Sequence, residues 1–127
     1  MVATTGLFSG IAVRDIDEAR TFYGETLGLE VTDNPMSAFN IALPQGGSIF
    51  VYPKGDHVPA TYTVLNLEVE NIDRAVEELT EAGVALERYE MSHQDEKGIA
   101  RGKSVNMGPD IAWFLDPSGN ILSVLEN

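Results

Sequence analysis

A weak internal repeat limits the possible folds of this sequence more than any other feature. The segment Val13-Arg-Asp-Ile-Asp-Glu-Ala is echoed by Val69-Glu-Asn-Ile-Asp-Arg-Ala. In each copy a capping residue (Asp15 or Asn71) precedes apolar residues spaced by three and four, and a glycine ends the pattern (Gly28 or Gly83). This order of cap, apolar stripe and glycine is typical of an amphipathic helix. The repeat therefore predicts one helix in each half of the chain.

Short β-rich runs flank both predicted helices. One run precedes each helix, at Phe8–Val13 and Thr63–Val69. Three runs follow the first helix, at Glu30–Asp33, Ala38–Leu43 and Ser48–Tyr52, and three follow the second, at Ala85–Glu90, Ile111–Leu115 and Asn120–Leu125. In each half the last two runs are joined by a turn with an early proline and a late glycine, which indicates a tight hairpin.

Each half thus has the order strand, helix, strand, strand, strand, which predicts an α+β fold of two paired βαβββ modules. We expect one domain over residues 1–127, with modules at about 5–57 and 60–127 and a linker at Pro53–Pro59. One helix can cover only one face of such a sheet. The two uncovered faces are therefore expected to form a shared concave cleft.

Charge and composition exclude several classes of partner. The chain has 8 Lys and Arg against 20 Asp and Glu, a formal net charge of −12, which argues against nucleic acid and anionic membranes as partners. The absence of cysteine excludes disulfides and thiolate chemistry. No apolar run approaches the roughly 20 residues of a membrane span, so a cytoplasmic protein is expected. The acidic balance suits a cationic ligand, although it also serves solubility.

Three segments resemble the vicinal oxygen chelate superfamily: residues 13–23, Leu27-Gly28-Leu29, and the aspartate-proline-serine-glycine turn within residues 114–122. That family includes glyoxalase I, extradiol dioxygenases, methylmalonyl-CoA epimerase and the bleomycin and fosfomycin resistance proteins. The resemblance covers nearly the whole chain and implies the paired-module fold. It also implies a homodimer, because the family often pairs modules between chains.

The resemblance further implies four positions where the enzymes of the family hold a divalent metal. They fall on Phe8, on Phe50 or Val51, on Val64 and on Ser123. None of these side chains is a normal metal ligand. The only histidines, His57 and His93, lie in polar stretches that are expected to be solvated loops, and their spacing fits no zinc or iron site. We therefore expect no metal, no cofactor and no catalytic residue that can be named.

Strand alternation assigns the remaining side chains to the helix or to the cleft. Leu7, Ile11, Val13, Leu65, Leu67 and Val69 are expected to face the helices, and Phe8, Gly10, Ala12, Val64, Asn66 and Glu68 the cleft. The expected ligand-binding residues are Phe8, Phe50, Val64, Asn66, Trp113 and Ser123, with Tyr52 as a further candidate. The alternative is that the apolar positions simply fill a collapsed core.

The segment Met91–Pro109 has little periodicity, which is typical of a lid, a binding loop or a disordered stretch. Arg101 or Lys103 could contact an anionic group there, and a solvated mobile loop is the alternative.

Three functions stay open at this point. The first is a metal-free binder of a small organic molecule, aromatic or cationic, similar to the bleomycin resistance proteins. The second is a divergent enzyme of the glyoxalase or dioxygenase type, and the third is a domain with no ligand. The side chains at the four inherited metal positions argue against the second.

Overall fold

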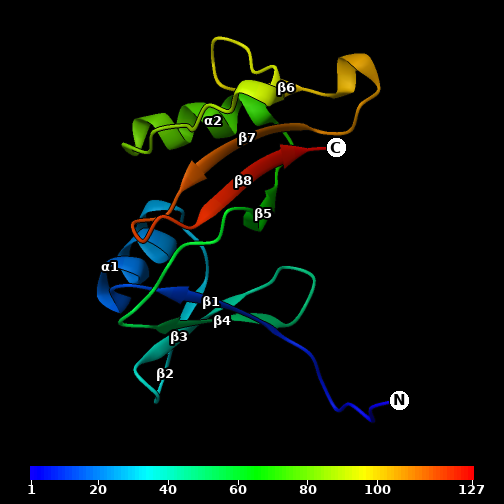
Figure 1. Cartoon of the computed structure of the whole chain (residues 1–127). Coiled ribbons are helices and arrows are strands. Elements are labelled where there is room, and N and C mark those ends of the chain that lie inside the picture. The colour runs from blue at the N-terminus through cyan, green and yellow to red at the C-terminus, as the bar shows by residue number, and fades with distance from the viewer. The chain divides into compact units, whose positions relative to one another are not determined.

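The computed structural model describes residues 1–127, with the exception of the side chain of Met91. The fold is α+β, with two four-stranded mixed sheets and one main helix for each sheet (Figure 1). The chain divides into two compact units, Met1–Val58 and Pro59–Asn127. The shared cleft expected between the two sheets stays a prediction.

The first unit forms a sheet with the strand order β1-β4-β3-β2. Its elements are β1 (Ser9–Val13), α1 (Ile16–Thr21), the π-helical turn η1 (Phe22–Thr26), β2 (Val31–Asn34), β3 (Ala38–Ala42) and β4 (Ser48–Pro53). Strand β1 runs parallel to β4, and the other neighbours are antiparallel. The parallel pair arises because α1 carries the chain back across one face of the sheet before β2 begins.

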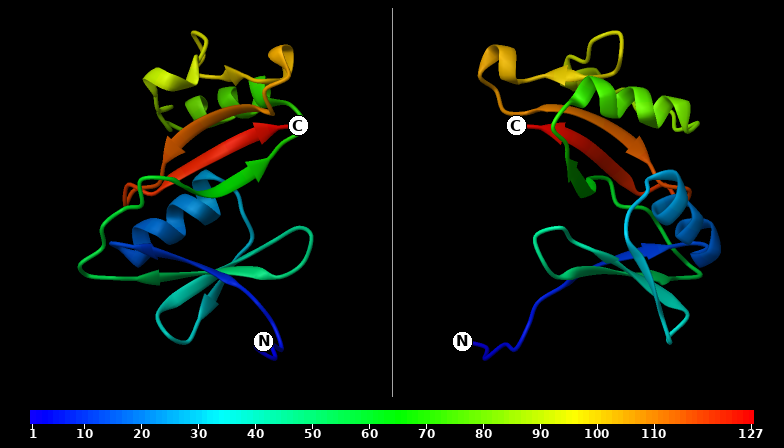
Figure 2. Two further views of the ribbon diagram at one scale, coloured as in Figure 1. Left: turned by 45° about the vertical axis from the view of Figure 1, so that its right-hand side comes forward. Right: turned by 180° about the vertical axis from the view of Figure 1, so that it is seen from behind.

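The second unit repeats this topology with the order β5-β8-β7-β6. Its elements are β5 (Thr63–Glu68), α2 (Ile72–Glu81), the 3₁₀ turns η2 (Glu90–Ser92) and η3 (Lys103–Val105), β6 (Ala100–Arg101), β7 (Asp110–Leu115) and β8 (Ile121–Glu126). Strand β5 is parallel to β8, and β8 is antiparallel to β7. Helix α2 lies along one face of this sheet (Figure 2).

Both helices begin at the predicted caps. The Asp15 carboxylate accepts from the amide of Glu18 at 3.0 Å, and the Asn71 side chain accepts from the amide of Arg74 at 3.0 Å. The first helix changes to a π turn after Thr21, a detail that the apolar spacing does not predict. Phe22 and Tyr23 are both buried there, since each residue of a π turn rotates less about the axis than in an α-helix.

The hydrophobic core of each unit lies between the helix and its sheet. In the first unit it contains Ile11, Val13, Ala19, Tyr23, Phe39, Ile41 and Val51, and in the second Ile72, Val76, Leu79, Ala112, Phe114, Leu122 and Val124. Alternate strand residues supply the sheet side of both cores, as the pattern predicts. Leu7 is an exception: it lies before β1 and is 94% exposed, so its expected place beside Ile11 is wrong.

The two predicted hairpins are confirmed, and both are closed by the same backbone hydrogen bond. The Leu43 amide donates to the Gly47 carbonyl in the first unit, and the Asp116 amide donates to the Asn120 carbonyl in the second, each at 3.0 Å. In the second, the buried carboxylate of Asp116 accepts from the amides of Ser118 and Asn120 and from the Asn120 side chain, each at 2.9 Å. Gly119 has a φ of 86°, which favours glycine at this position of the turn.

The strand expected at Ala85–Glu90 does not form. Leu86 makes an isolated bridge to Phe114, and the chain then turns into η2. The β-rich composition of this segment does not determine the length of a strand or its pairing, because an edge strand depends on a partner strand that the local sequence does not encode. Among the described residues, no helix is long and apolar enough to cross a membrane.

Candidate functional site

Each sheet has a face opposite its helix, here called the open face. In the second unit its central row contains Asn66, Ser123 and Trp113, which are neighbours on β5, β8 and β7. All three were expected to bind a ligand, and the strand register brings them together. They alternate with the core residues Leu122 and Phe114, which explains why the row faces away from α2.

Ser123 and Asn66 form a polar pair in this row. The Ser123 hydroxyl donates to the Asn66 side-chain oxygen at 2.6 Å. Ser123 is fully buried, whereas Asn66 is exposed. A buried hydroxyl requires a partner, so the pair satisfies Ser123 and fixes the direction of the Asn66 amide.

Trp113 lies at the other end of the row and contacts Tyr89. The two ring centroids are 5.5 Å apart at an interplanar angle of 80°. Burial and the nearby Glu87 carboxylate raise the pKa of Tyr89. Sequence reasoning missed Tyr89 because it assigned this residue to a regular strand, although an aromatic residue next to a lid-like segment was the available signal.

Gln94 holds the chain in place around Tyr89. Its side-chain oxygen accepts from the Tyr89 amide at 2.8 Å and from the Ser92 hydroxyl at 2.6 Å. Its side-chain nitrogen donates to the carbonyls of Glu87 and Gly98 at 2.8 and 2.6 Å. One half-buried amide thus joins two stretches of chain through both its oxygen and its nitrogen, a role that no sequence pattern indicates.

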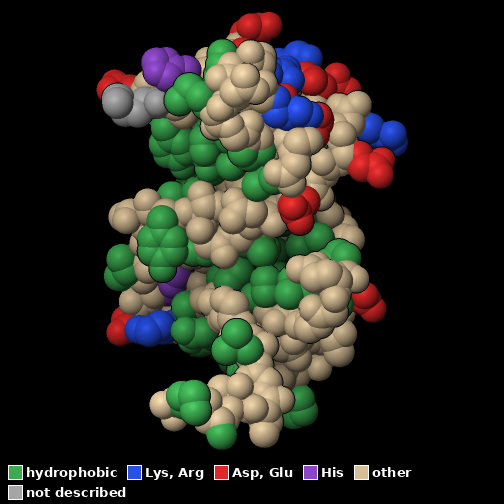
Figure 3. All heavy atoms as spheres, turned by 90° about the vertical axis from the view of Figure 1, so that its right-hand side faces the viewer, with side chains coloured by type: hydrophobic (Ala, Val, Ile, Leu, Met, Phe, Trp, Pro, Cys, Tyr) green, Lys and Arg blue, Asp and Glu red, His purple; other side chains and the backbone are tan. Residues whose placement is uncertain are grey.

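Ion pairs fasten the segment Met91–Pro109 to the rest of its unit. Arg101 donates to Asp73 at 2.7 and 3.1 Å and to Asp95 at 3.0 Å. Hydrogen bonds from Arg101 and Lys97 hold the pKa of Asp73 well below its usual range. Figure 3 shows acidic and basic side chains intermingled on this part of the second unit.

Lys103 is also paired, since its ammonium group lies 2.5 Å from a Glu126 carboxylate oxygen. The same carboxylate accepts from the amide of Ile72 at the start of α2. Arg101 and Lys103, the two side chains expected to contact an anionic group, are therefore both paired with carboxylates of the chain. Both side chains stay partly exposed, so the alternative of a solvated loop stays a prediction.

The open face of the first unit is aromatic. The rings of Phe50 and Tyr52 stack with centroids 5.6 Å apart, and the Phe8 ring meets the Phe50 ring edge-on at 6.4 Å. Phe8 lies just before β1 and is 71% exposed. Gly10 lies beside Phe50, and Val51 is fully buried on the helix side. The strand register thus places Phe50, and not Val51, on the open face.

Val64 occupies an irregular position in β5. Thr63 is the partner of Ile121 and Leu65 is the partner of Leu122, so Val64 is an extra residue with no partner position on β8. Such a bulge interrupts the alternation of faces that the expectation for Val64 used. Val64 is half-buried.

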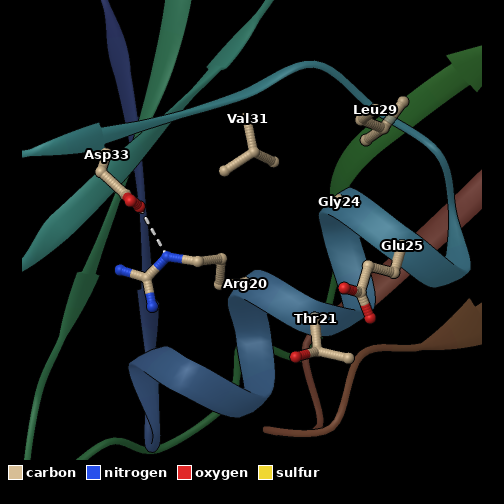
Figure 4. A pocket seen from close by; sticks show the side chains of 7 residues that line it. All are labelled: Arg20, Thr21, Gly24, Glu25, Leu29, Val31 and Asp33. Atoms are coloured by element: carbon tan, nitrogen blue, oxygen red, sulfur yellow. Dashed lines mark hydrogen bonds and ion pairs between the residues drawn. The ribbon is translucent and has the colours of Figure 1, made fainter.

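A pocket of about 330 Å³ lies elsewhere in the first unit, between the first helix and β2 (Figure 4). Arg20, at its edge, donates to Asp33 at 2.6 Å and to Asp17 at 2.8 Å, and its guanidinium lies 5.7 Å from the Phe39 ring centroid. Leu29 and Val31 line the pocket together with Thr21 and Glu25. Because both Arg20 ion pairs are internal to the chain, this pocket presents little free charge for an anion.

The described residues do not fit a metal site. The inherited positions Phe8, Phe50, Val64 and Ser123 offer two rings, an alkyl group and a hydroxyl that is already bonded to Asn66. No group of three or more His, Asp or Glu residues that could hold an ion occurs in the described part of the chain. His93 is exposed, but the Nε2 atom of His57 is buried without a partner among the described groups, so the expectation that both are solvated is wrong for His57.

Comparison with known proteins agrees with this architecture. The family model described as "Glyoxalase/Bleomycin resistance protein/Dioxygenase superfamily" matches residues 6–124. Among solved structures, a member of that superfamily from Sphaerobacter thermophilus is 23% identical, with a TM-score of 0.66 over 96% of this chain and 98% of the other. A glyoxalase/dioxygenase from Nostoc punctiforme is 17% identical, with a TM-score of 0.67 over 100% and 97%.

The antibiotic-binding protein TnmS3 from a Streptomyces species is another structural relative. It is 21% identical, with a TM-score of 0.66 over 99% of this chain and 98% of the other. At this identity the likeness concerns the fold. A search of the curated proteins found no match.

Proposed function

The chain belongs to the glyoxalase/bleomycin resistance protein/dioxygenase superfamily, and from this premise we propose that it binds a small organic molecule without metal chemistry. The observation that carries the proposal is the composition of the two open faces. They present rings and a serine–asparagine pair at and beside the positions where enzymes of the family are expected to hold a metal. A divalent ion requires imidazole or carboxylate ligands, which these positions lack.

The proposed ligand has an aromatic or apolar body. Phe8 and Phe50 supply ring surface in the first unit, and Trp113 supplies it in the second. Burial of apolar surface contributes roughly 25 cal/mol per Å², so contact with one or two rings can give measurable affinity. The proposed binding residues are therefore Phe8, Phe50, Val64, Asn66, Trp113 and Ser123.

A cationic ligand is proposed in preference to an anionic one. The formal net charge of −12 attracts cations over a long range, and a tryptophan face attracts them at contact by roughly 0.5–2 kcal/mol. The internal pairing of Arg101 and Lys103 supports the same choice, since these two cations already face carboxylates. The fold is compatible with such a role, because TnmS3 has a similar fold and is described as antibiotic-binding.

Trp113 is the only tryptophan and gives a direct test. Planar organic cations, cationic glycopeptide drugs and neutral aromatics are titrated against its fluorescence, with calorimetry on Trp113→Phe to detect binding that does not depend on the reporter. We expect saturable quenching, weakened by salt for the cations alone. Stronger binding of anionic ligands would overturn the charge argument.

Metal content is tested on the same preparation by elemental analysis and native mass spectrometry. We expect no stoichiometric transition metal. About one zinc, nickel, manganese or iron ion per chain, together with a melting temperature that a chelator lowers, would favour the enzymatic alternative.

We propose in addition that the protein is a cytoplasmic homodimer. The assembly follows the resemblance to the family, and a two-fold dimer is the commonest closed oligomer. The exposed ring of Phe8 is compatible with a surface that a second chain covers. Light scattering at micromolar concentration checks the mass, and a monomer would contradict this part of the proposal.

A further inference from the structure

We infer that Asn66 selects ligands that carry an uncharged hydrogen-bond acceptor, such as a carbonyl oxygen, beside their aromatic body. The inference rests on the proposed binding function and adds a specificity-determining residue to it. It starts from the direction of one amide group on the open face of the second unit.

The bond from Ser123 determines that direction. The Ser123 hydroxyl donates to the Asn66 oxygen at 2.6 Å, and Ser123 itself is fully buried. In the opposite orientation the buried hydroxyl proton would lose this acceptor, which costs more than an unused lone pair. The Asn66 oxygen is therefore occupied, and the two N–H donors of the amide are left to face outward.

Those donors are available to a ligand. Asn66 is exposed, and its side-chain nitrogen makes no hydrogen bond to another described residue. Trp113 lies two strands away in the same row, which corresponds to about 10 Å between backbones. A planar molecule of two or three fused rings can contact the Trp113 ring with one edge and accept from Asn66 through an oxygen on the opposite edge.

A neighbouring carboxylate restricts the acceptor further. Glu68 lies two residues along β5 on the same face, is exposed, and accepts from the Asn127 side chain at 3.0 Å. A carboxylate or phosphate on the ligand would meet this negative charge at short range. The Asn66 position thus favours a neutral carbonyl, amide or ether oxygen over an anionic one.

The first unit offers a matched control. By strand register Gly10 is paired with Phe50 and Phe50 with Asn40, as Asn66 is with Ser123 and Ser123 with Trp113. Gly10 has no side chain and therefore no donor at the place of Asn66. Asn40→Asp makes the same chemical change as Asn66→Asp on the other open face, so it reports any general effect of one added charge.

The experiment uses two tricyclic probes of similar shape: acridone, which is neutral and has a carbonyl acceptor, and 9-aminoacridine, which is cationic and has an amino donor. Calorimetry measures both on the full chain and on the variants. Asn66→Asp exchanges outward donors for an acceptor, so acridone should bind about tenfold more weakly while 9-aminoacridine binds as well or better. Asn40→Asp should leave the ratio of the two affinities unchanged.

Ser123→Ala supplies a second measurement, because it releases the amide without removing it. We expect it to lower the preference for acridone less than Asn66→Asp does. If both probes bind the wild type and the ratio of their affinities is the same in Asn66→Asp, the inference is overturned and the proposed function stays intact. If neither probe nor any other planar aromatic binds, the proposed function fails and this inference fails with it.

Discussion

The two units share one backbone plan and differ in what their open faces present. On the helix side both place apolar residues at equivalent positions, such as Val51 in the first unit and Val124 in the second. On the open side the row Gly10–Phe50–Asn40 corresponds by register to Asn66–Ser123–Trp113. The core therefore restricts both copies of the repeat alike, whereas the open faces are free to differ, as expected for surfaces that carry function.

The largest effect should come from a charge placed on the wrong face of the first sheet. Val51→Asp puts a carboxylate into a fully buried position and should lower the free energy of unfolding by more than about 3 kcal/mol. Phe50→Asp, one residue away on the open face, should lose only its ring contacts, about 1 kcal/mol. Urea denaturation measures both variants. Equal damage from the two would show that the faces are not distinct.

The next effect concerns the two hairpins. Asp116→Ala removes an acceptor of three hydrogen bonds in the second unit and should cost about 2–4 kcal/mol. Asp116→Asn keeps one acceptor oxygen and should cost less. The corresponding residue in the first unit is Leu43, whose side chain has no such acceptor. A thermal midpoint of Asp116→Ala equal to that of the wild type would refute the role of this carboxylate.

The edges of the two sheets give a third comparison. The first unit pairs β2 with β3 over four residues, whereas the second pairs β6 with β7 over only two and adds the hydrogen bonds of the Gln94 amide near Tyr89. Gln94→Ala should cost about 1–3 kcal/mol and shift the emission of Trp113 to longer wavelength as Tyr89 moves away. Gln45→Ala, at the exposed hairpin of the first unit, is the control. An unchanged Trp113 spectrum in Gln94→Ala would contradict the prediction.

The smallest effect is expected from the ion pairs. Because the pKa of Asp73 is lowered in the folded state, its contribution is complete above the ordinary carboxyl range near pH 4 and is lost as the pH falls below it. In Asp73→Asn the free energy of unfolding should therefore fall less steeply than in the wild type as the pH drops below about 4. Asp56→Asn should act in the same direction but more weakly, since one cation, Lys54, is the main cause of the lowered pKa of Asp56, whereas two cations act on Asp73. A steeper fall of the free energy of unfolding with decreasing pH in Asp73→Asn would contradict this prediction.

Local signals explain what could be predicted from the sequence. The caps Asp15 and Asn71 act within one helical turn, and the turn at Asp116 closes within five residues, so both are encoded where they occur. The alternation of apolar residues was likewise sufficient to separate the core from the open faces. These features gave the fold class and most of the strands.

Features that depend on distant partners could not be predicted. The choice between Phe50 and Val51 needed the register with β1 and β3, and the bulge at Val64 needed the register with β8. Gln94 and Tyr89 act through contacts made across a segment without periodicity. For the candidate site, the sequence supplied the residues Asn66, Ser123 and Trp113 but neither their adjacency nor the bond that orients Asn66.

The Asp116 turn also has a consequence for the order in which the protein folds. Strands β7 and β8 are joined by a short connection, but β5 meets β8 only after more than fifty residues have been ordered. Closing a long loop costs more entropy, so we expect the β7–β8 hairpin to form first and the parallel pair last. Pulse-labelled hydrogen exchange would show early protection of the Ala112 amide, which faces β8, and late protection of the Leu67 amide; simultaneous protection would contradict this order. The first unit has the same connectivity, so in both units the residue that completes the open row, Gly10 or Asn66, joins the sheet at the final step.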